Sequence, residues 1–300
     1  MTMTRDEMIL KAQQVRARNS FPPATEGELA ALPAEETLFH LETAGHTVPV
    51  YRISPKRGLI HHCPMIINFH GGGYMKGRFD RDRIYCSHLS DSTGALVWDV
   101  DYSLAPEAPF PTAVEEAAAV VRYAFDHAEE LDVDPQHIFL TGHSAGGGLV
   151  AAVCQLLAGE AGHTPAAVMM EYLPADMATD PVSKLTPEQL ADDRERGRAE
   201  TGRLYNQFYT GDADPHNPLI SPLFADSRVL GQFPDSLVIT AGLDPLCEEG
   251  EQFALRLAQS GVRVTLRRFL QSPHGFTINR MGEWEQSLAM QAEFLLDHIG

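Results

Sequence analysis

The sequence lacks the features of a disulfide-stapled, secreted or membrane-spanning protein. Its four cysteines lie far apart and show no C-x-x-C spacing, so reduced thiols fit them better than a disulfide framework does. The first residues carry charges but no apolar stretch typical of a signal peptide. No apolar run approaches the roughly 20 residues that a helix needs to cross a bilayer. These absences predict a soluble, cytoplasmic protein.

Basic residues are also scarce. The chain has 23 Lys and Arg residues against 41 Asp and Glu residues, which gives a formal net charge of −18 at pH 7. Binding to nucleic acid or to an anionic membrane depends on Lys and Arg, so we expect neither partner. A solvated acidic surface that aids solubility accounts for this charge.

Predicted strands and helices alternate along most of the 300 residues, a length that suits one large domain. The apolar and alternating runs predict strands at 37–43 and 47–53 (a hairpin), 65–69, 95–100, 138–141, 166–172, 237–241 and 262–269. Helix-compatible segments lie at 6–18, 112–131, 148–158, 249–260 and 284–299. This order predicts an α/β fold with a mostly parallel central sheet, helices on both faces and antiparallel strands at one edge.

Two segments depart from this alternation. Residues 1–35 are expected to form helix and loop, and the charged, polar segment at about 179–209 interrupts the regular order. We therefore interpret residues 36–300 as one core that carries an insertion at about 179–209.

The pentapeptide 142–146, Gly-His-Ser-Ala-Gly, stands between a predicted strand and a predicted helix. This context is typical of a nucleophile elbow, a sharp turn that exposes a serine hydroxyl, and it makes Ser144 the candidate nucleophile. Gly and Ser also fill ordinary loops, so the flanking elements carry the argument. His143 should project away from the serine at such a turn, which favours a packing role for it.

A nucleophilic serine needs a base, and the base needs an acid that orients it. His274 is the candidate base because it lies in the loop directly after the last predicted strand. Asp244 is the candidate acid because it follows the strand at 237–241, and Glu248 is the alternative. The chain order Ser144, Asp244, His274 is the order found in the fold that carries this elbow.

Three consecutive glycines follow His70, directly after the predicted strand at 65–69. Their backbone amides can approach a developing oxyanion closely, so we expect an oxyanion hole made by the amides of Gly72, Gly73 and Ala145. We expect His70 to hold this loop in shape. The run lacks the Lys and the spacing of a phosphate-binding loop.

We expect no metal site and no cofactor. His61, His62 and the scattered cysteines lack the spacing of metal ligands, and acyl transfer by a serine requires neither.

Four motifs together resemble the hormone-sensitive-lipase-like family of α/β-hydrolase carboxylesterases. They are His-Gly-Gly-Gly at 70–73, the segment 101–111 that begins Asp-Tyr-Ser-Leu-Ala-Pro, Gly-His-Ser-Ala-Gly-Gly at 142–147, and 244–250 followed by His-Gly-Phe at 274–276. The resemblance implies an α/β-hydrolase core and hydrolysis of short-chain carboxylic esters. It also implies a small helical cap, built from residues 1–35 and the insertion at about 179–209. The family usually has Asp before the serine, where this chain has His143.

The substrate is less sharply predicted than the reaction. Tyr74, Tyr205 and Phe208 are candidates for lining the substrate pocket. The same machinery would serve an aryl, feruloyl or sugar-acetyl ester, or an amide. A non-catalytic ligand-binding protein on this fold is a further alternative, although such proteins that resemble the family lack the histidine of the triad, which is present here as His274. Relatives often pair through the edge strand, here 262–269, so a homodimer is expected.

Overall fold

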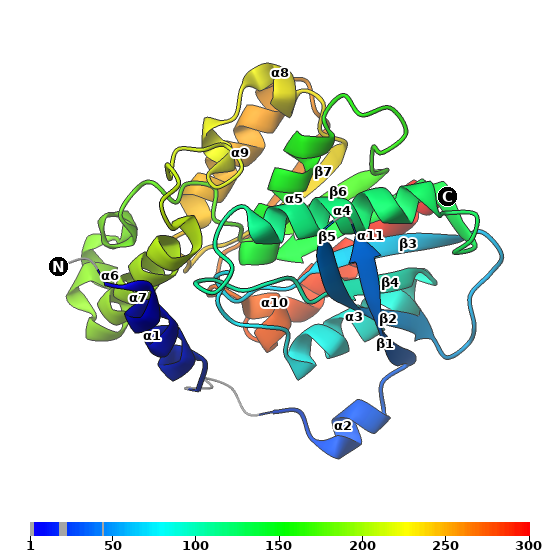
Figure 1. Cartoon of the computed structure of the whole chain (residues 1–300), viewed down its shortest axis with the longest axis horizontal. Helices are drawn as coiled ribbons and strands as arrows, with labels where there is room; N and C mark the ends of the chain where they lie inside the picture. Colours follow the sequence, from blue (N-terminus) through cyan, green and yellow to red (C-terminus); the bar gives the residue numbers. More distant parts are fainter. Residues whose placement is uncertain (1–2, 18–22, 44) are drawn as a thin grey trace.

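An eight-stranded sheet forms the centre of the computed structural model, which describes residues 3–17, 23–43 and 45–300 (Figure 1). The strand order is β1-β2-β4-β3-β5-β6-β7-β8. The strands are β1 (Ala34–Thr43), β2 (His46–Pro55), β3 (Cys63–Phe69), β4 (Leu96–Val100), β5 (Val133–His143), β6 (Ala167–Glu171), β7 (Asp235–Ala241) and β8 (Val264–Phe269). β2 pairs antiparallel with β1 and with β4, and the remaining pairs are parallel. The predicted sheet, with antiparallel strands at one edge, is therefore confirmed.

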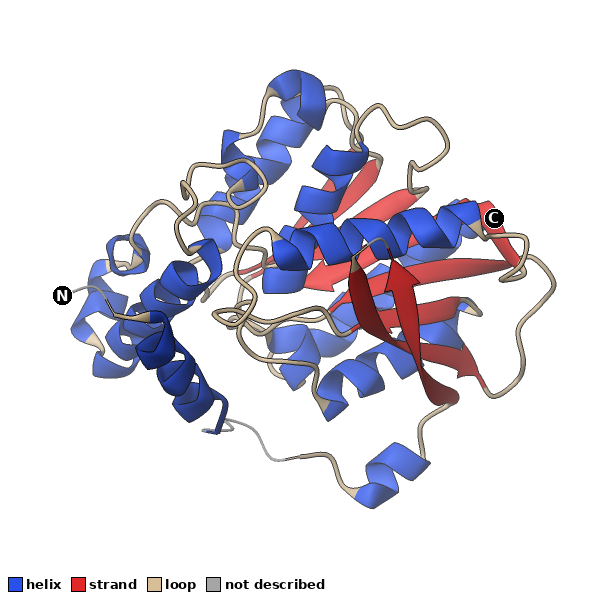
Figure 2. Cartoon of the chain, viewed as in Figure 1, coloured by secondary structure: helices blue, strands red, loops and turns tan. Residues whose placement is uncertain are grey.

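Helices cover both faces of this sheet (Figure 2). One face packs against α4 (Thr112–Asp126), α5 (Ala145–Leu157) and α9 (Cys247–Gln259), and the other packs against α3 (Asp80–Thr93) and α11 (Trp284–Ile299). The shorter helices of the core are α2 (Glu26–Ala30), α8 (Ser227–Leu230), α10 (Phe276–Asn279) and the 3₁₀ helix η2 (Pro222–Phe224). Every residue of β3 and of β4 is buried, as a strand covered on both faces requires. The structure confirms the predicted α/β-hydrolase fold class.

The functional candidates follow the carboxyl ends of the parallel strands. The glycine run follows β3, Ser144 follows β5, and the loops with Asp244 and His274 follow β7 and β8. In a parallel sheet these ends meet at one edge, where ligands bind. The fold thereby brings Gly71 and His274, which lie 203 positions apart in the chain, to the same edge of the sheet.

Further helices lie beyond this edge, at the left of Figure 1. They are α1 (Arg5–Ala17), the 3₁₀ helix η1 (Pro181–Lys184), α6 (Pro187–Ala191) and α7 (Asp193–Thr210). We propose that they form a cap. Arg16 of α1 donates hydrogen bonds to the backbone oxygens of Met75 (2.7 Å) and Ala105 (2.8 Å), in the loops that follow β3 and β4. Helix α2 lies apart from α1 in Figure 1, so we do not include it in the proposed cap.

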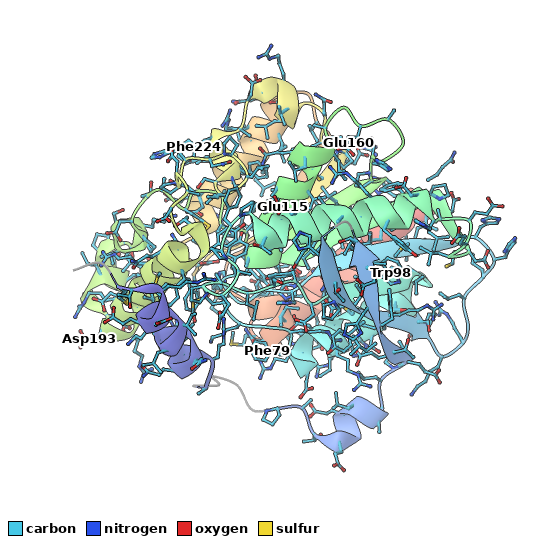
Figure 3. The ribbon with its side chains drawn as sticks, viewed as in Figure 1. Phe79, Trp98, Glu115, Glu160, Asp193 and Phe224 are labelled. Atoms are coloured by element: carbon cyan, nitrogen blue, oxygen red, sulfur yellow. The ribbon has the colours of Figure 1, made fainter. Side chains whose placement is uncertain are left out.

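The outer surface of the proposed cap carries charged as well as apolar side chains, among them Leu10 and Leu190, which are 58% and 45% exposed. Asp193, at the start of α7, points away from the molecule and its side chain is 89% exposed (Figure 3). Nowhere in the described ranges is there a helix both long and apolar enough to span a lipid bilayer.

Candidate active site

Ser144 is the single residue between the end of β5 and the start of α5. Its backbone angles are φ 54° and ψ −122°, a strained conformation that a non-glycine residue adopts only where the surroundings hold it. The Ser144 amide donates to the backbone oxygen of Glu171 (2.9 Å), and the Gly148 amide donates to that of Ser144 (3.2 Å). Strand and helix together therefore fix the turn that presents the Ser144 side chain.

The turn is tight because α5 approaches β3 closely at Gly146. A Cβ added to Gly146 would lie 1.8 Å from the carbonyl oxygen of Phe69 and 2.8 Å from that of His70. Both are backbone atoms of the strand end that leads into the glycine run. The residue type at position 146 therefore sets the distance between the elbow and this run.

We expect Gly146→Ala to destabilise the protein by at least about 3 kcal/mol, because its methyl group overlaps backbone that a rotamer change cannot move. Urea unfolding measures this. Gly197→Ala is the matched control: Gly197 lies within α7, and an added Cβ there meets nothing within 4 Å. Alanine is the better helix former by about 1 kcal/mol, so the control should be neutral or stabilising. Equal stability of the two variants would refute the close-approach argument.

His274 joins Ser144 to Asp244. The Ser144 hydroxyl lies 2.9 Å from Nε2 of His274, and Nδ1 of the same ring lies 2.6 Å from Oδ2 of Asp244. The Asp244 side chain is 2% exposed, whereas that of His274 is 40% exposed. The structure thus brings together the three residues that the sequence analysis selected, with the acid buried and the base open to a substrate.

Two neighbours shape the environment of His274. Burial lowers the pKa of His274, but the charge of Asp244 and its hydrogen bond outweigh that effect and raise the pKa above its ordinary value. The ring of Tyr172 packs edge-on against the imidazole, with centroids 5.1 Å apart. Tyr172 is not among the predicted site residues because the strand predicted at 166–172 includes it, whereas β6 ends at Glu171 and leaves Tyr172 directly after the strand.

The glycine run, the candidate oxyanion loop, has a backbone that glycine adopts more readily than other residues do. Gly72 and Gly73 have φ values of 128° and 62°, where L side chains are strained. Among the described residues their two amides donate to no partner. Ala145 begins α5, so its amide has no carbonyl one turn earlier in the helix. All three candidate donors are therefore free to bind an anion.

The His70 side chain packs beneath the backbone of the glycine run and contacts Gly71 and Tyr102. Its buried ring stacks on Tyr102 with centroids 4.3 Å apart, and its Nδ1 lies 2.7 Å from the Gly71 oxygen. The Tyr102 hydroxyl donates to the backbone oxygen of His70 (2.8 Å). Burial lowers the pKa of His70, but Asp101 and other carboxylates nearby outweigh it and raise the pKa. These contacts fit the expected structural role.

His143, which replaces the usual Asp, forms a buried pair with Asp82 of α3. Its Nε2 lies 2.8 Å from Oδ1 of Asp82. Burial raises the pKa of Asp82, but the hydrogen bond and charge of His143 outweigh it and lower the pKa. The His143 ring also lies against Gly71, where an added Cβ would be 3.0 Å from Cδ2. His143 therefore packs between α3 and the glycine run, and it points away from Ser144 as expected.

The three candidates for pocket lining occupy different environments. Tyr74 and Phe208 are 2% and 1% exposed, and Tyr74 stacks on Tyr209 with centroids 3.6 Å apart. Tyr205 of α7 keeps part of its surface exposed, and its ring covers Gly73, where an added Cβ would lie 2.2 Å from Cδ2. Of the three, Tyr205 is the one that lies over the glycine run and keeps accessible surface.

A buried ion pair ties the insertion to the core. Lys184 of η1 donates to Glu249 of α9 and to the backbone oxygen of Asp176. The Glu249 carboxylate also accepts the amides of Ala175 (2.8 Å) and Asp176 (3.1 Å). Burial raises the pKa of Glu249 to about 6 despite these partners. Because α9 begins three residues after Asp244, this contact holds the insertion beside the loop of the candidate acid.

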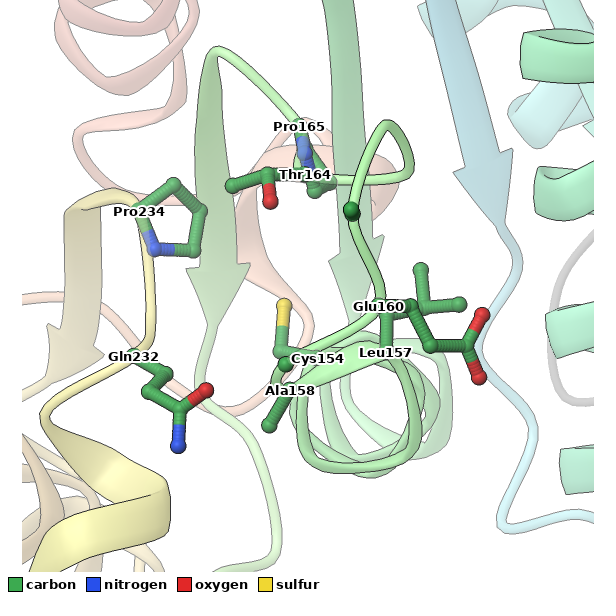
Figure 4. Close-up of a pocket in the computed structure, with 10 residues that line it drawn as sticks. Cys154, Leu157, Ala158, Glu160, Thr164, Pro165, Gln232 and Pro234 are labelled. Carbon is green, nitrogen blue, oxygen red and sulfur yellow. The ribbon is translucent and has the colours of Figure 1, made fainter.

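A cavity of about 370 Å³ lies away from this site, at the far end of α5 (Figure 4). Cys154 lines it, together with Leu157, Thr164, Pro165, Gln232 and Pro234. Cys154 lies ten positions after Ser144, which corresponds to about 15 Å along the helix axis. Burial raises the pKa of Cys154 to about 12, so this thiol is protonated and unreactive at neutral pH.

Known proteins resemble this chain in sequence. A sequence model of the family described as alpha/beta hydrolase fold matches residues 66–278. The carboxylic ester hydrolase LipN of Mycobacterium tuberculosis is 35% identical over 228 residues, which cover 71% of this chain and 57% of that protein. The ethyl acetate hydrolase of Pseudomonas putida is 31% identical over 262 residues, which cover 85% of this chain and 80% of that protein. The chain therefore spans little more than half the length of the first relative and most of the second.

Solved structures resemble it in fold. Carboxyl esterase 2 of the mycorrhizal fungus Tuber melanosporum has a TM-score of 0.81 at 24% identity, over 97% of both chains. The esterase of Pyrobaculum calidifontis has a TM-score of 0.77 at 25% identity, over 98% of this chain and 92% of that one. These structures show the fold. The family match over residues 66–278, with 31% identity to the ethyl acetate hydrolase, identifies the chain: it belongs to the hormone-sensitive-lipase-like family of α/β hydrolases.

Proposed function

We propose that this protein is a serine carboxylesterase that hydrolyses short-chain esters through Ser144, His274 and Asp244. One observation carries the proposal: the continuous chain of contacts from the Ser144 hydroxyl through His274 to the buried Asp244, with distances of 2.9 and 2.6 Å. A nucleophile, a base and an orienting acid in hydrogen-bond contact are what acyl transfer by a serine requires.

In the proposed reaction the Ser144 oxygen attacks the ester carbonyl carbon while Nε2 of His274 takes the hydroxyl proton. The amides of Gly72, Gly73 and Ala145 stabilise the negative charge that develops on the carbonyl oxygen. The intermediate collapses as His274 returns the proton to the leaving alcohol, which leaves an acyl-enzyme. Water then attacks the acyl carbon with His274 again as base, and the carboxylic acid departs.

A short acyl group is supported by the position of Tyr205. Its ring covers Gly73 of the oxyanion loop and so limits the space beside the carbonyl of a bound ester. One relative, which matches 85% of this chain, is named for the hydrolysis of ethyl acetate. We therefore propose acetyl and other short acyl esters as the substrate class.

A p-nitrophenyl ester series from acetyl to octanoyl, with a feruloyl ester alongside, tests this function. We expect kcat/KM to be highest for the shortest acyl groups and to fall as the chain lengthens. A maximum at octanoyl, or a preference for the feruloyl ester, would contradict the proposed substrate class. Stoichiometric binding of these esters without any turnover would contradict catalysis itself.

Removing the ring of Tyr205 should widen the acyl preference. We expect Tyr205→Ala to raise the ratio of kcat/KM for the hexanoyl ester to that for the acetyl ester by about tenfold, since pocket volume discriminates chain length by about this much. The matched control is Tyr205→Phe, which keeps the ring and should keep the wild-type ratio. If Tyr205→Ala keeps the wild-type ratio, the Tyr205 ring does not set the limit on acyl chain length.

We also propose a cytoplasmic location and a homodimer. The location is supported by four buried free thiols at Cys63, Cys86, Cys154 and Cys247.

Dimerisation is supported by β8, an edge strand of the sheet on which Leu266 is 45% exposed. Light scattering coupled to gel filtration measures the mass in solution, and a monomer at micromolar concentration would refute the dimer.

A further inference from the structure

Three side chains with metal-binding groups meet at the opposite edge of the sheet from Ser144. They are His61 and His62, just before β3, and Asp132, just before β5. Each offers a ligand atom, and these atoms all lie within 4.8 Å of one another. The two histidines show no ligand spacing in the sequence because the third member, Asp132, lies 70 residues from His62.

The sheet itself holds these residues together. β3 and β5 are parallel neighbours, and Cys63 is in register with Val133. His62 and Asp132 are the residues that directly precede this register pair. Because both positions are set by the ends of central strands, the geometry depends on the rigid part of the fold.

Backbone conformation turns the side chains toward one another. Successive side chains of an extended segment point to opposite sides. His62 instead has φ 51°, and the rings of His61 and His62 lie 4.1 Å apart between centroids. Asp132 also has a positive φ, 56°. Neither residue is a glycine, so the surrounding structure holds both in an uncommon conformation.

Hydrogen bonds and a contact with His61 fix the orientation of the Asp132 carboxylate. Oδ1 of Asp132 accepts the His62 amide (3.0 Å) and contacts Nδ1 of His61. The backbone oxygen of Asp132 accepts the Cys63 amide (3.0 Å). The side chains of His61 and Asp132 are nonetheless 79% and 53% exposed, so an ion can reach them from solvent.

We propose that His61, His62 and Asp132 bind a divalent transition-metal ion of the Zn²⁺ class. Two imidazole nitrogens and one carboxylate oxygen are a ligand set that Zn²⁺ accepts, with water completing the tetrahedron. The imidazoles select against Mg²⁺ and Ca²⁺, which prefer oxygen ligands.

An ion at this site would stabilise the folded protein and would take no part in ester hydrolysis. β5 has 11 residues and separates Asp132 from Ser144 by roughly 35 Å. An ion bound across the start of β3 and the start of β5 would join two chain segments that are distant in sequence. Since such an ion binds the native state, it should stabilise that state by linkage.

Calorimetric titration of the full chain with ZnCl₂ tests the proposal. We expect about one equivalent of Zn²⁺ to bind the wild type. His61→Ala and Asp132→Asn should each weaken this binding by at least about tenfold. Asparagine tolerates a positive φ and can still accept the His62 amide, so Asp132→Asn should preserve the fold. MgCl₂ in place of ZnCl₂ should give no binding.

His216→Ala is the matched control, because His216 is also an exposed histidine beside a carboxylate, that of Asp214. It should bind Zn²⁺ as the wild type does. Ester hydrolysis at the saturating Zn²⁺ concentration should be unchanged, which separates this site from one at His274. The proposal fails if the wild type binds no Zn²⁺, if the His61 and Asp132 variants bind it as tightly as the wild type does, or if binding abolishes activity.

Discussion

Replacing Ser144 by alanine is expected to lower kcat for p-nitrophenyl acetate by about 10⁶, or about 8 kcal/mol in the activation barrier. The reason is that the variant removes the oxygen that forms the acyl-enzyme, while His274 and the oxyanion amides stay in place. The residual rate would come from binding and from those amides acting on a water molecule.

The fold should survive this substitution. Ser144 keeps its strained φ of 54° through backbone contacts to Glu171 and Gly148, which alanine can make equally well. Urea unfolding should therefore give a stability within about 0.5 kcal/mol of the wild type. Ser92→Ala, at an exposed position near the end of α3, is the control and should keep full activity. If Ser144→Ala keeps more than about one hundredth of the rate, Ser144 is not the nucleophile.

The fold class could be predicted because its signal repeats along the chain. A strand buried on both faces is mostly apolar, and β3 shows this in the run Met65 to Phe69, where Asn68 is the one polar residue. Helix α3 shows why other elements escape prediction. Its buried face includes Asp82, Ser87 and Ser90, so no apolar period marks it.

The candidate site could be predicted as far as the positions next to strand ends. Ser144, Asp244 and His274 each follow a strand that is visible in the sequence, and parallel strands bring their carboxyl ends to one edge. Chain order then assigns the roles, with no need to know any distance. Position and chain order together are enough to single out these three residues in a chain with 41 carboxylates and 13 histidines.

Partners set by packing between distant segments could not be predicted in this way. The contact of His143 with Asp82 depends on how α3 rotates against the sheet, and the two residues are 61 positions apart. The meeting of His61 with Asp132 depends on the register of β3 with β5 and on a positive φ at His62. Neither the register of two strands nor the sign of a φ angle leaves a pattern in a single sequence.

Asp244→Asn is expected to lower kcat by about 10⁴ while KM changes little. Asp244 accepts the Nδ1 proton of His274, which leaves Nε2 free to take the proton of Ser144. An amide at position 244 can present its NH₂ group to Nδ1, which places the ring proton on Nε2. In that tautomer His274 can no longer act as base toward Ser144.

The pH profile of the same variant separates this role from a merely structural one. Catalysis needs neutral His274, and Asp244 contributes to a pKa above the ordinary histidine value of about 6.5. The acidic limb of kcat/KM should therefore lie above pH 6.5 in the wild type. It should move to lower pH in Asp244→Asn, because the favourable charge next to the imidazolium is gone.

Glu248→Gln is the matched control for this experiment. Glu248 is the other carboxylate that could serve as the acid by its place in the chain, but it is exposed at the start of α9. Because Asp244 already occupies Nδ1 of His274 at 2.6 Å, Glu248→Gln should keep both the rate and the acidic limb of the wild type. If Glu248→Gln loses as much rate as Asp244→Asn does, the assignment of Asp244 as the acid is wrong. The assignment is also wrong if Asp244→Asn lowers the rate without moving the acidic limb, because a residue that only supports the fold would have that effect.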